Sequence, residues 1–102
     1  MQLLTKELTS KLPALYTQEN EEDPMVICKF FTVWSNWTWY GIEFDGKDTF
    51  YGYVVGHEAE LGYFSLSELQ NLKGPMGLSI ERDMYFNPCR LSEIKKIHEP
   101  GV

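Results

Sequence analysis

The sequence predicts an α+β fold, with an antiparallel sheet of four to five strands and short helices packed on one face. Three observations support this prediction. Runs rich in aromatic and β-branched residues, which are typical of strands, fill residues 25–64. Helix-capping patterns precede short apolar repeats before and after that region. The 102 residues suffice for one hydrophobic core and not for two, so we expect a single domain over 1–102.

The first element is expected to be a short amphipathic helix that begins after Thr5. Thr5 is a favourable N-cap, and Leu8, Leu12 and Leu15 recur at the spacing of one helical face. Pro13 has no amide proton to donate, so the regular helix is expected to end or kink near Leu12.

An acidic loop is expected over residues 18–24, closed by Pro24. Four carboxylates fall within five positions there, and such runs are usually solvated. They belong to Glu19, Glu21, Glu22 and Asp23.

Three strand candidates follow this loop. Residues 25–33 are apolar at both odd and even positions, as expected for a strand that is covered on both faces. Residues 37–45 and 48–55 have the pattern of a hairpin whose turn contains Gly46 and Lys47.

The hairpin also predicts which side chains share a face. A two-residue turn places Gly41 opposite Gly52, and facing glycines leave room for a tryptophan ring across the backbone. One face is then aromatic and aliphatic, whereas the other has tryptophans near one end and carboxylates near the turn. The first face comprises Tyr40, Ile42, Phe44, Tyr51 and Tyr53, and the second comprises Trp37, Trp39, Phe50, Val54, Glu43, Asp45 and Asp48.

The rest of the chain predicts two more strands and two more helices. Residues 61–64 form a short strand that leads into a helix, because Ser65 and Glu68 have the spacing of a capping box. Alternating apolar positions over 80–86 predict a last strand. An apolar repeat over 91–97 predicts a C-terminal helix, and residues 99–102 are expected to be a frayed tail.

Charge and composition narrow the possible partners. The chain has 15 acidic and 9 basic residues, with a formal net charge of -6 at pH 7. Direct binding to nucleic acid or to an anionic membrane is not expected, because both need clustered Lys and Arg. No apolar run is long enough to span a bilayer and the opening segment is too short for a secretory signal. We therefore expect a cytoplasmic protein in which Cys28 and Cys89 are reduced.

Side chains that could carry catalysis are few. His57 lies near Glu58 and Glu60, but no second cluster completes a metal shell. Cys89 follows Pro88 near a basic residue, yet nothing places a histidine beside it. We expect no catalytic residue, no metal site and no cofactor.

The triplet Glu81, Arg82 and Asp83 is a candidate structural ion pair. In a strand, Arg82 points to the same side as Ile80 and Met84, and a guanidinium in apolar surroundings needs a carboxylate partner. The alternatives are that Arg82 binds an anion or a carboxylate ligand, or that the triplet is the centre of a small enzyme.

The acids and tryptophans are also candidates for a partner-binding surface. If strand order brings the acidic loop and the hairpin turn together, with a tryptophan at the rim, the surface suits a basic protein. The candidates are Glu19, Glu21, Glu22, Asp23, Glu43, Asp45, Asp48, Trp37 and Trp39. Strand order and oligomeric state stay open at this point.

Several runs resemble a domain-of-unknown-function family of small single-domain proteins carried on bacterial plasmids, conjugative elements and phages. The resemblance covers about residues 3–94, and its most specific parts are 60–69 (ELGYFSLSEL) and 77–83 (GLSIERD). The other matching runs are 3–5 (LLT), 39–40 (WY), 43–45 (EFD) and 86–88 (FNP).

A branch of that family resembles the type II-A anti-CRISPR proteins, which inhibit the RNA-guided nuclease of type II systems. The resemblance implies a mobile-element protein that binds this nuclease or its guide complex inside a bacterial host and blocks it without enzymatic activity. It assigns no catalytic residues. The alternative is an accessory plasmid or conjugation protein that binds another basic protein.

Overall fold

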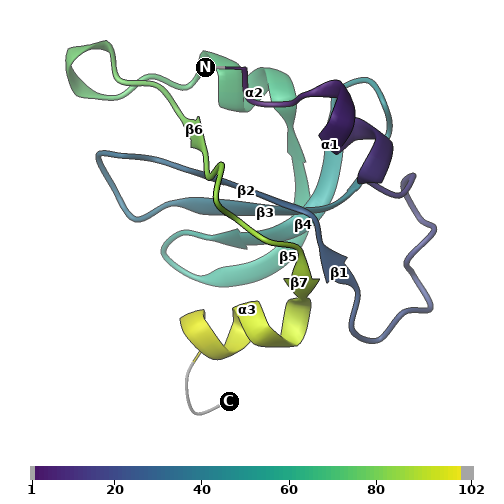
Figure 1. The fold of residues 1–102 in the computed structure, drawn as a ribbon. Helices are drawn as coiled ribbons and strands as arrows, with labels where there is room; N and C mark the ends of the chain where they lie inside the picture. Colours follow the sequence, from purple (N-terminus) through teal and green to yellow (C-terminus); the bar gives the residue numbers. More distant parts are fainter. Residues whose placement is uncertain (1, 100–102) are drawn as a thin grey trace.

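The computed structural model describes residues 2–99 (Figure 1). Its centre is a five-stranded antiparallel sheet in the order β5-β4-β3-β2-β6. A small antiparallel pair, β1 (Met25–Val26) and β7 (Cys89–Arg90), lies beside it. The main strands are β2 (Cys28–Phe31), β3 (Thr38–Phe44), β4 (Thr49–Val55), β5 (Ala59–Ser65) and β6 (Glu81–Arg82). The predicted α+β class and antiparallel sheet are confirmed.

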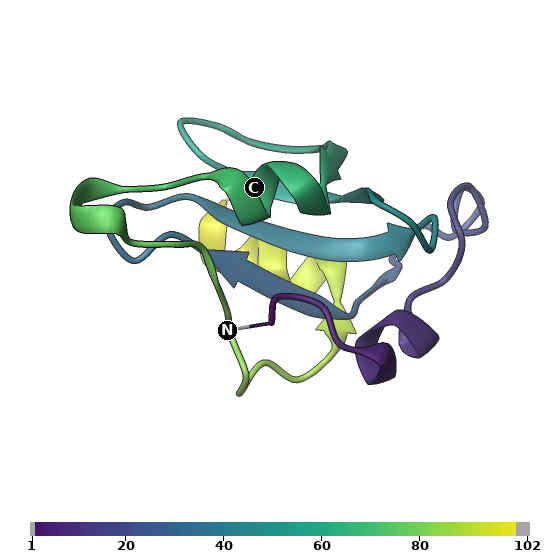
Figure 2. The same cartoon turned by 90° about the horizontal axis from the view of Figure 1, so that it is seen from above.

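Short helices cover both faces of the sheet. In Figure 1, α1 (Lys6–Lys11) and α2 (Leu66–Asn71) lie on one side of the strands, and α3 (Leu91–His98) lies on the other. Figure 2 shows α3 behind the sheet when the molecule is viewed from above. A 3-10 turn, η1 (Pro75–Gly77), follows α2. The expected placement on one face differs from this arrangement, because six of the seven residues of β3 are buried and both of its faces need a cover.

Each face of the sheet therefore has its own hydrophobic core. The core on the side of α1 and α2 contains Leu3, Leu12, Cys28, Phe30, Trp39, Phe44, Phe50, Phe64, Leu69 and Ile80. The core under α3 contains Val26, Tyr40, Ile42, Tyr53, Leu91 and Ile94.

The β3–β4 hairpin contains two irregularities whose effects on the strand register cancel. Gly41 lies opposite Gly52, as predicted. The turn, however, is longer than predicted, because Phe44 pairs with Phe50 and the Asp45 amide donates to the Thr49 carbonyl at 2.9 Å. A β-bulge between Gly41 and Glu43 compensates for the extra turn residue.

The bulge moves two side chains to the faces opposite to those predicted. Phe44 joins the core with Trp39 and Phe50, whereas Glu43 lies opposite Tyr51. The predicted positions of Phe44 and Glu43 were therefore wrong, because a bulge shifts the alternation of side chains by one residue.

The facing glycines do not hold a tryptophan ring. A Cβ atom at Gly52 would lie 1.8 Å from the Tyr40 carbonyl oxygen and 3.2 Å from the Phe64 ring. The Trp37 ring instead crosses Gly56, where a Cβ atom would lie 2.4 Å from it. Only a glycine leaves room for these close approaches.

Local signals placed the remaining elements with small differences. The predicted strand over 25–33 is interrupted at Ile27, and the strand predicted over 80–86 is only two residues long in β6. The Ser65 hydroxyl accepts a hydrogen bond from the Glu68 amide at 3.0 Å, as expected for an N-cap. Of the predicted tail, residues 100–102 lie outside the described residues, and Glu99 accepts a hydrogen bond from the Tyr53 hydroxyl.

Candidate functional site

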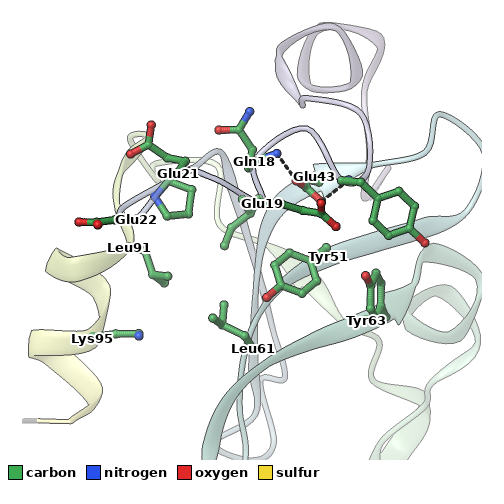
Figure 3. A pocket seen from close by; sticks show the side chains of 13 residues that line it. Gln18, Glu19, Glu21, Glu22, Glu43, Tyr51, Leu61, Tyr63, Leu91 and Lys95 are labelled. Carbon is green, nitrogen blue, oxygen red and sulfur yellow. Dashed lines mark hydrogen bonds between the residues drawn. The ribbon is translucent and has the colours of Figure 1, made fainter.

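A hollow of about 490 Å³ lies on the face of the sheet that α3 covers (Figure 3). The loop between α1 and β1, strands β3 to β5, and α3 surround it, and its volume is typical of binding pockets. Its lining residues are Tyr16, Gln18, Glu19, Glu21, Glu22, Pro24, Ile42, Glu43, Tyr51, Leu61, Tyr63, Leu91 and Lys95.

A buried carboxylate holds the loop against the sheet in this hollow. Glu43 is only 3% exposed. One carboxylate oxygen accepts a hydrogen bond from the Tyr16 amide at 3.0 Å, and the other accepts one from the Gln18 amide at 2.8 Å (Figure 3). Tyr16 has a left-handed backbone, with φ at 70°. Because a buried carboxylate needs hydrogen-bond donors, the loop and the bulged strand stabilise each other.

Tyrosine rings form the wall next to Glu43. The Tyr51 and Tyr63 ring centroids are 5.1 Å apart, and Tyr63 is 57% exposed. Desolvation and the neighbouring Tyr16 hydroxyl raise the pKa of Tyr63, so its hydroxyl stays protonated near neutral pH. The wall thus offers aromatic faces and the neutral hydroxyl group of Tyr63.

Glutamates form the rim of the hollow. Glu19 and Glu22 are exposed, and a Glu21 carboxylate oxygen accepts a hydrogen bond from the Asp23 amide at 3.3 Å. Lys95 is the one cationic side chain among the lining residues, against four glutamates. The hollow therefore carries a net negative charge and exposes aromatic surface, which suits a cationic group.

The family model described as "Protein of unknown function (DUF2958)" matches residues 3–99. The chain belongs to the DUF2958 family. None of the curated proteins and none of the solved structures compared with the chain matches it. The predicted domain-of-unknown-function family is thereby confirmed. Among the described residues of this DUF2958 protein, no helix is both long enough and apolar enough to cross a membrane.

Besides Glu43, three more of the predicted partner-binding acids accept hydrogen bonds that hold the fold of the DUF2958 protein. Asp23 accepts from the amide (2.8 Å) and hydroxyl (2.7 Å) of Ser92 at the start of α3. Asp48 accepts from the amide and hydroxyl of Ser67, each at 2.8 Å, at the start of α2. Asp45 accepts from three backbone amides of its own turn. These bonds lower the pKa of Asp23 and Asp45.

Strand order brings the two acidic segments to the same end of the sheet but not into one site. Because Cys28 pairs with Gly41 in antiparallel strands, the loop before β2 lies beside the end of β3. Of the hairpin acids, only Glu43 lines the hollow with the loop glutamates.

The predicted tryptophans lie elsewhere. Trp39 pairs with Val54, far along the hairpin from its turn, and is 7% exposed within the core. Trp37 is 37% exposed and stacks on Trp39 with ring centroids 5.9 Å apart. Neither lines the hollow. The wall of the hollow instead has Tyr51, Tyr63 and Leu61, which sequence reasoning missed as a binding surface because the packing of the loop between α1 and β1 on Glu43 depends on the bulge.

The triplet formed by β6 and the residue after it, Asp83, holds neighbouring segments together. Asp83 forms an ion pair with Lys29, whose Nζ atom lies 3.7 Å from the Asp83 Oδ2 atom. The Arg82 guanidinium donates to the backbone carbonyl oxygens of Gln2 and Leu3. Glu81 pairs with Phe31 in the strand ladder. Asp83 thus forms a structural ion pair with a lysine of β2, whereas the ion pair expected from the sequence was one between Arg82 and a carboxylate.

The environments of the cysteines and of His98 are set by burial and by one close contact. Burial raises the pKa of Cys28 to about 12, and desolvation also raises that of Cys89, so both thiols stay protonated near neutral pH. The His98 Nε2 atom lies 2.6 Å from the Tyr40 hydroxyl. Within residues 2–99, no group of three or more His, Cys, Asp or Glu is placed to hold a metal ion.

Proposed function

We propose that this DUF2958 protein is a mobile-element protein of the bacterial cytoplasm that binds a type II RNA-guided DNA nuclease and blocks it without a chemical step of its own. The acidic, tyrosine-walled hollow carries the proposal, because lysine and arginine side chains bind to carboxylates and to aromatic faces. The resemblance to type II-A anti-CRISPR proteins supplies the identity of the partner.

The charge of the two proteins favours this partner. RNA-guided nucleases hold nucleic acid in positively charged channels and read the sequence next to the target with arginine side chains. A protein with a net charge of -6 and glutamates around a hollow can occupy such a channel in place of phosphates. Association is then steered by charge and weakens as salt is added.

The state of the reactive side chains supports a mechanism that uses binding alone. Asp23, Asp45 and Asp48 already accept hydrogen bonds from the fold, and the raised pKa of Cys28 keeps its thiol protonated. Binding to the rim glutamates needs none of these groups to react.

The test is a DNA-cleavage and DNA-binding assay with a purified type II nuclease–guide complex, with the protein in excess and at two salt concentrations. We expect inhibition that weakens at the higher salt. The variant Glu22→Lys should weaken inhibition by about tenfold, since it reverses one rim charge. The matched control Glu58→Lys makes the same change at an exposed glutamate outside the hollow and should keep full inhibition.

Two results would contradict the proposal. If an excess of protein changes neither DNA binding nor cleavage, the nuclease is not the partner, and the accessory-protein alternative replaces it. If Glu22→Lys and Glu58→Lys weaken inhibition equally, the hollow is not the binding site.

A further inference from the structure

Strand β5 is a long edge of the main sheet, and no other strand of residues 2–99 pairs with its outer side. It has seven residues and pairs with β4 without a break in register, whereas the opposite edge strand, β6, has two residues. Natural proteins protect such edges with Pro, charged side chains or a bulge, and β5 has no Pro, no bulge and a single charged residue, Glu60. An edge of this length with so little protection is suited to pairing with another strand.

The ladder shows which backbone groups of β5 are available. The Leu66 amide donates to the Asp48 carbonyl at 2.8 Å, which makes this a hydrogen-bonded pair next to the end of the β4–β5 ladder. Hydrogen-bonded pairs recur at every second residue in an antiparallel ladder, so the even-numbered residues of β5 bond to β4. The N–H and C=O groups that point outward belong to Ala59, Leu61, Tyr63 and Ser65.

The outward residues also expose apolar surface. Leu61 is 41% exposed and Tyr63 is 57% exposed, and both side chains lie on the side of the hollow (Figure 3). The side chains of the even-numbered residues Glu60 and Phe64 lie on the opposite face of the sheet.

We infer that β5 pairs with β5 of a second copy of this chain, in antiparallel orientation about a two-fold axis through Gly62. In this register all seven residues of each β5 strand are paired. Leu61 of each copy lies opposite Tyr63 of the other copy, as the two-fold symmetry of an isologous interface requires. Every outward N–H and C=O group then meets an outward group of the other copy.

Overlap favours this register over its neighbours, because an axis through Leu61 or Tyr63 would pair only five of the seven residues of β5. The strand has one charged residue, Glu60, which faces Phe64 of the second copy. The two Glu60 positions are then four residues apart along the strands, or roughly 14 Å, which exceeds the Debye length of about 8 Å. An axis through Glu60 itself would place the two carboxylates directly opposite each other. Because paired residues share a face, the two hollows would lie on the same side of one continuous sheet.

Sedimentation velocity over a range of concentrations tests the pairing. We expect a monomer–dimer equilibrium that shifts toward the dimer as salt is added, because each copy carries a charge of -6. Leu61→Asp should raise the dissociation constant by about tenfold or more, since the change occurs twice in the interface. Leu78→Asp is the matched control, because Leu78 is 42% exposed and lies outside β5, and it should leave the equilibrium unchanged.

A cross-link tests the register without relying on a disruptive variant. In a non-hydrogen-bonded antiparallel pair the Cα atoms are about 4.5 Å apart, which a disulfide can bridge. A Cβ atom at Gly62 would meet nothing within 4 Å, so Gly62→Cys should fold normally. In a Cys89→Ser background it should form a disulfide-linked dimer on mild oxidation, whereas Ser79→Cys should not.

The inference is overturned if the protein stays monomeric at all concentrations and both salts, or if Gly62→Cys and Ser79→Cys cross-link equally. It is also overturned if the Leu61→Asp and Leu78→Asp variants shift the equilibrium to the same extent. Monomeric protein whose β5 amides become protected only on binding another polypeptide would assign the edge to that partner instead.

Discussion

Replacing the buried carboxylate with an amide, as in Glu43→Gln, is expected to release the loop between α1 and β1 from the sheet. Both carboxylate oxygens accept hydrogen bonds, from the amides of Tyr16 and Gln18. A glutamine has one acceptor oxygen, so its NH₂ group must face one of these two N–H donors. The substitution therefore changes hydrogen bonding while leaving shape and volume almost unchanged.

The expected cost follows from these two hydrogen bonds. A hydrogen bond to a charged group contributes about 1.5–3 kcal/mol, and a buried donor left without a partner costs about 1–3 kcal/mol. Because the glutamine still accepts one bond, we expect a loss of about 2–4 kcal/mol in the free energy of unfolding. For a domain of this size, that corresponds to a decrease in Tm of about 8 °C or more.

Urea and thermal unfolding followed by circular dichroism measure this loss directly. Glu19→Gln makes the same chemical change at an exposed position of the same hollow, and its stability should stay within about 0.5 kcal/mol of the parent. If Glu43→Gln is as stable as Glu19→Gln, the carboxylate does not hold the loop, and our account of the hollow is wrong.

Three further predictions concern the turn, the thiols and the glycines. Hydrogen bonds hold the pKa of Asp45 below its ordinary value of 3.8, so its stabilising effect is complete above that pH and is lost as the pH falls below it. The free energy of unfolding measured with urea should therefore change less with acidic pH in Asp45→Asn than in the parent protein. Because burial raises the pKa of Cys28 to about 12, Ellman's reagent should modify the half-buried Cys89 in the native protein and Cys28 only after unfolding. Gly52→Ala should cost more than about 3 kcal/mol in a urea titration, since its Cβ atom would lie 1.8 Å from a backbone oxygen, whereas Gly62→Ala should stay within about 0.5 kcal/mol.

Signals within a few residues of each other predicted most of the secondary structure. Thr5 and Ser65 cap their helices, and the pairing of Gly41 with Gly52 is in the predicted register. Apolar residues at both odd and even positions over 25–33 also indicate a strand that is covered on both faces, whereas the hairpin strand that became β3 was predicted to have one core face and one mixed face.

The site could not be predicted in the same way, because it depends on contacts between distant residues. The sequence gives no clear signal of the bulge before Glu43, because apolar residues occupy both odd and even positions of this strand. The bulge alone decides on which face of the sheet the Glu43 carboxylate lies. The donors to Glu43 are 25 and 27 residues away in sequence. Asp23 likewise bonds to Ser92, 69 residues away, so a solvated acidic loop and a capping carboxylate look identical in the sequence.

The acidic residues have two different roles. The two proposed interfaces are expected to respond to salt in opposite directions. Asp23, Asp45 and Asp48 accept hydrogen bonds from nearby N–H and O–H groups, and screening by salt affects such short contacts weakly. The rim glutamates, Glu19 and Glu22, are exposed, so their attraction for a basic partner should decrease as salt is added. Two copies that each carry -6 repel, so pairing through β5 should instead strengthen. One salt series therefore tests both proposals, because inhibition should decrease as salt is added while the dimer accumulates.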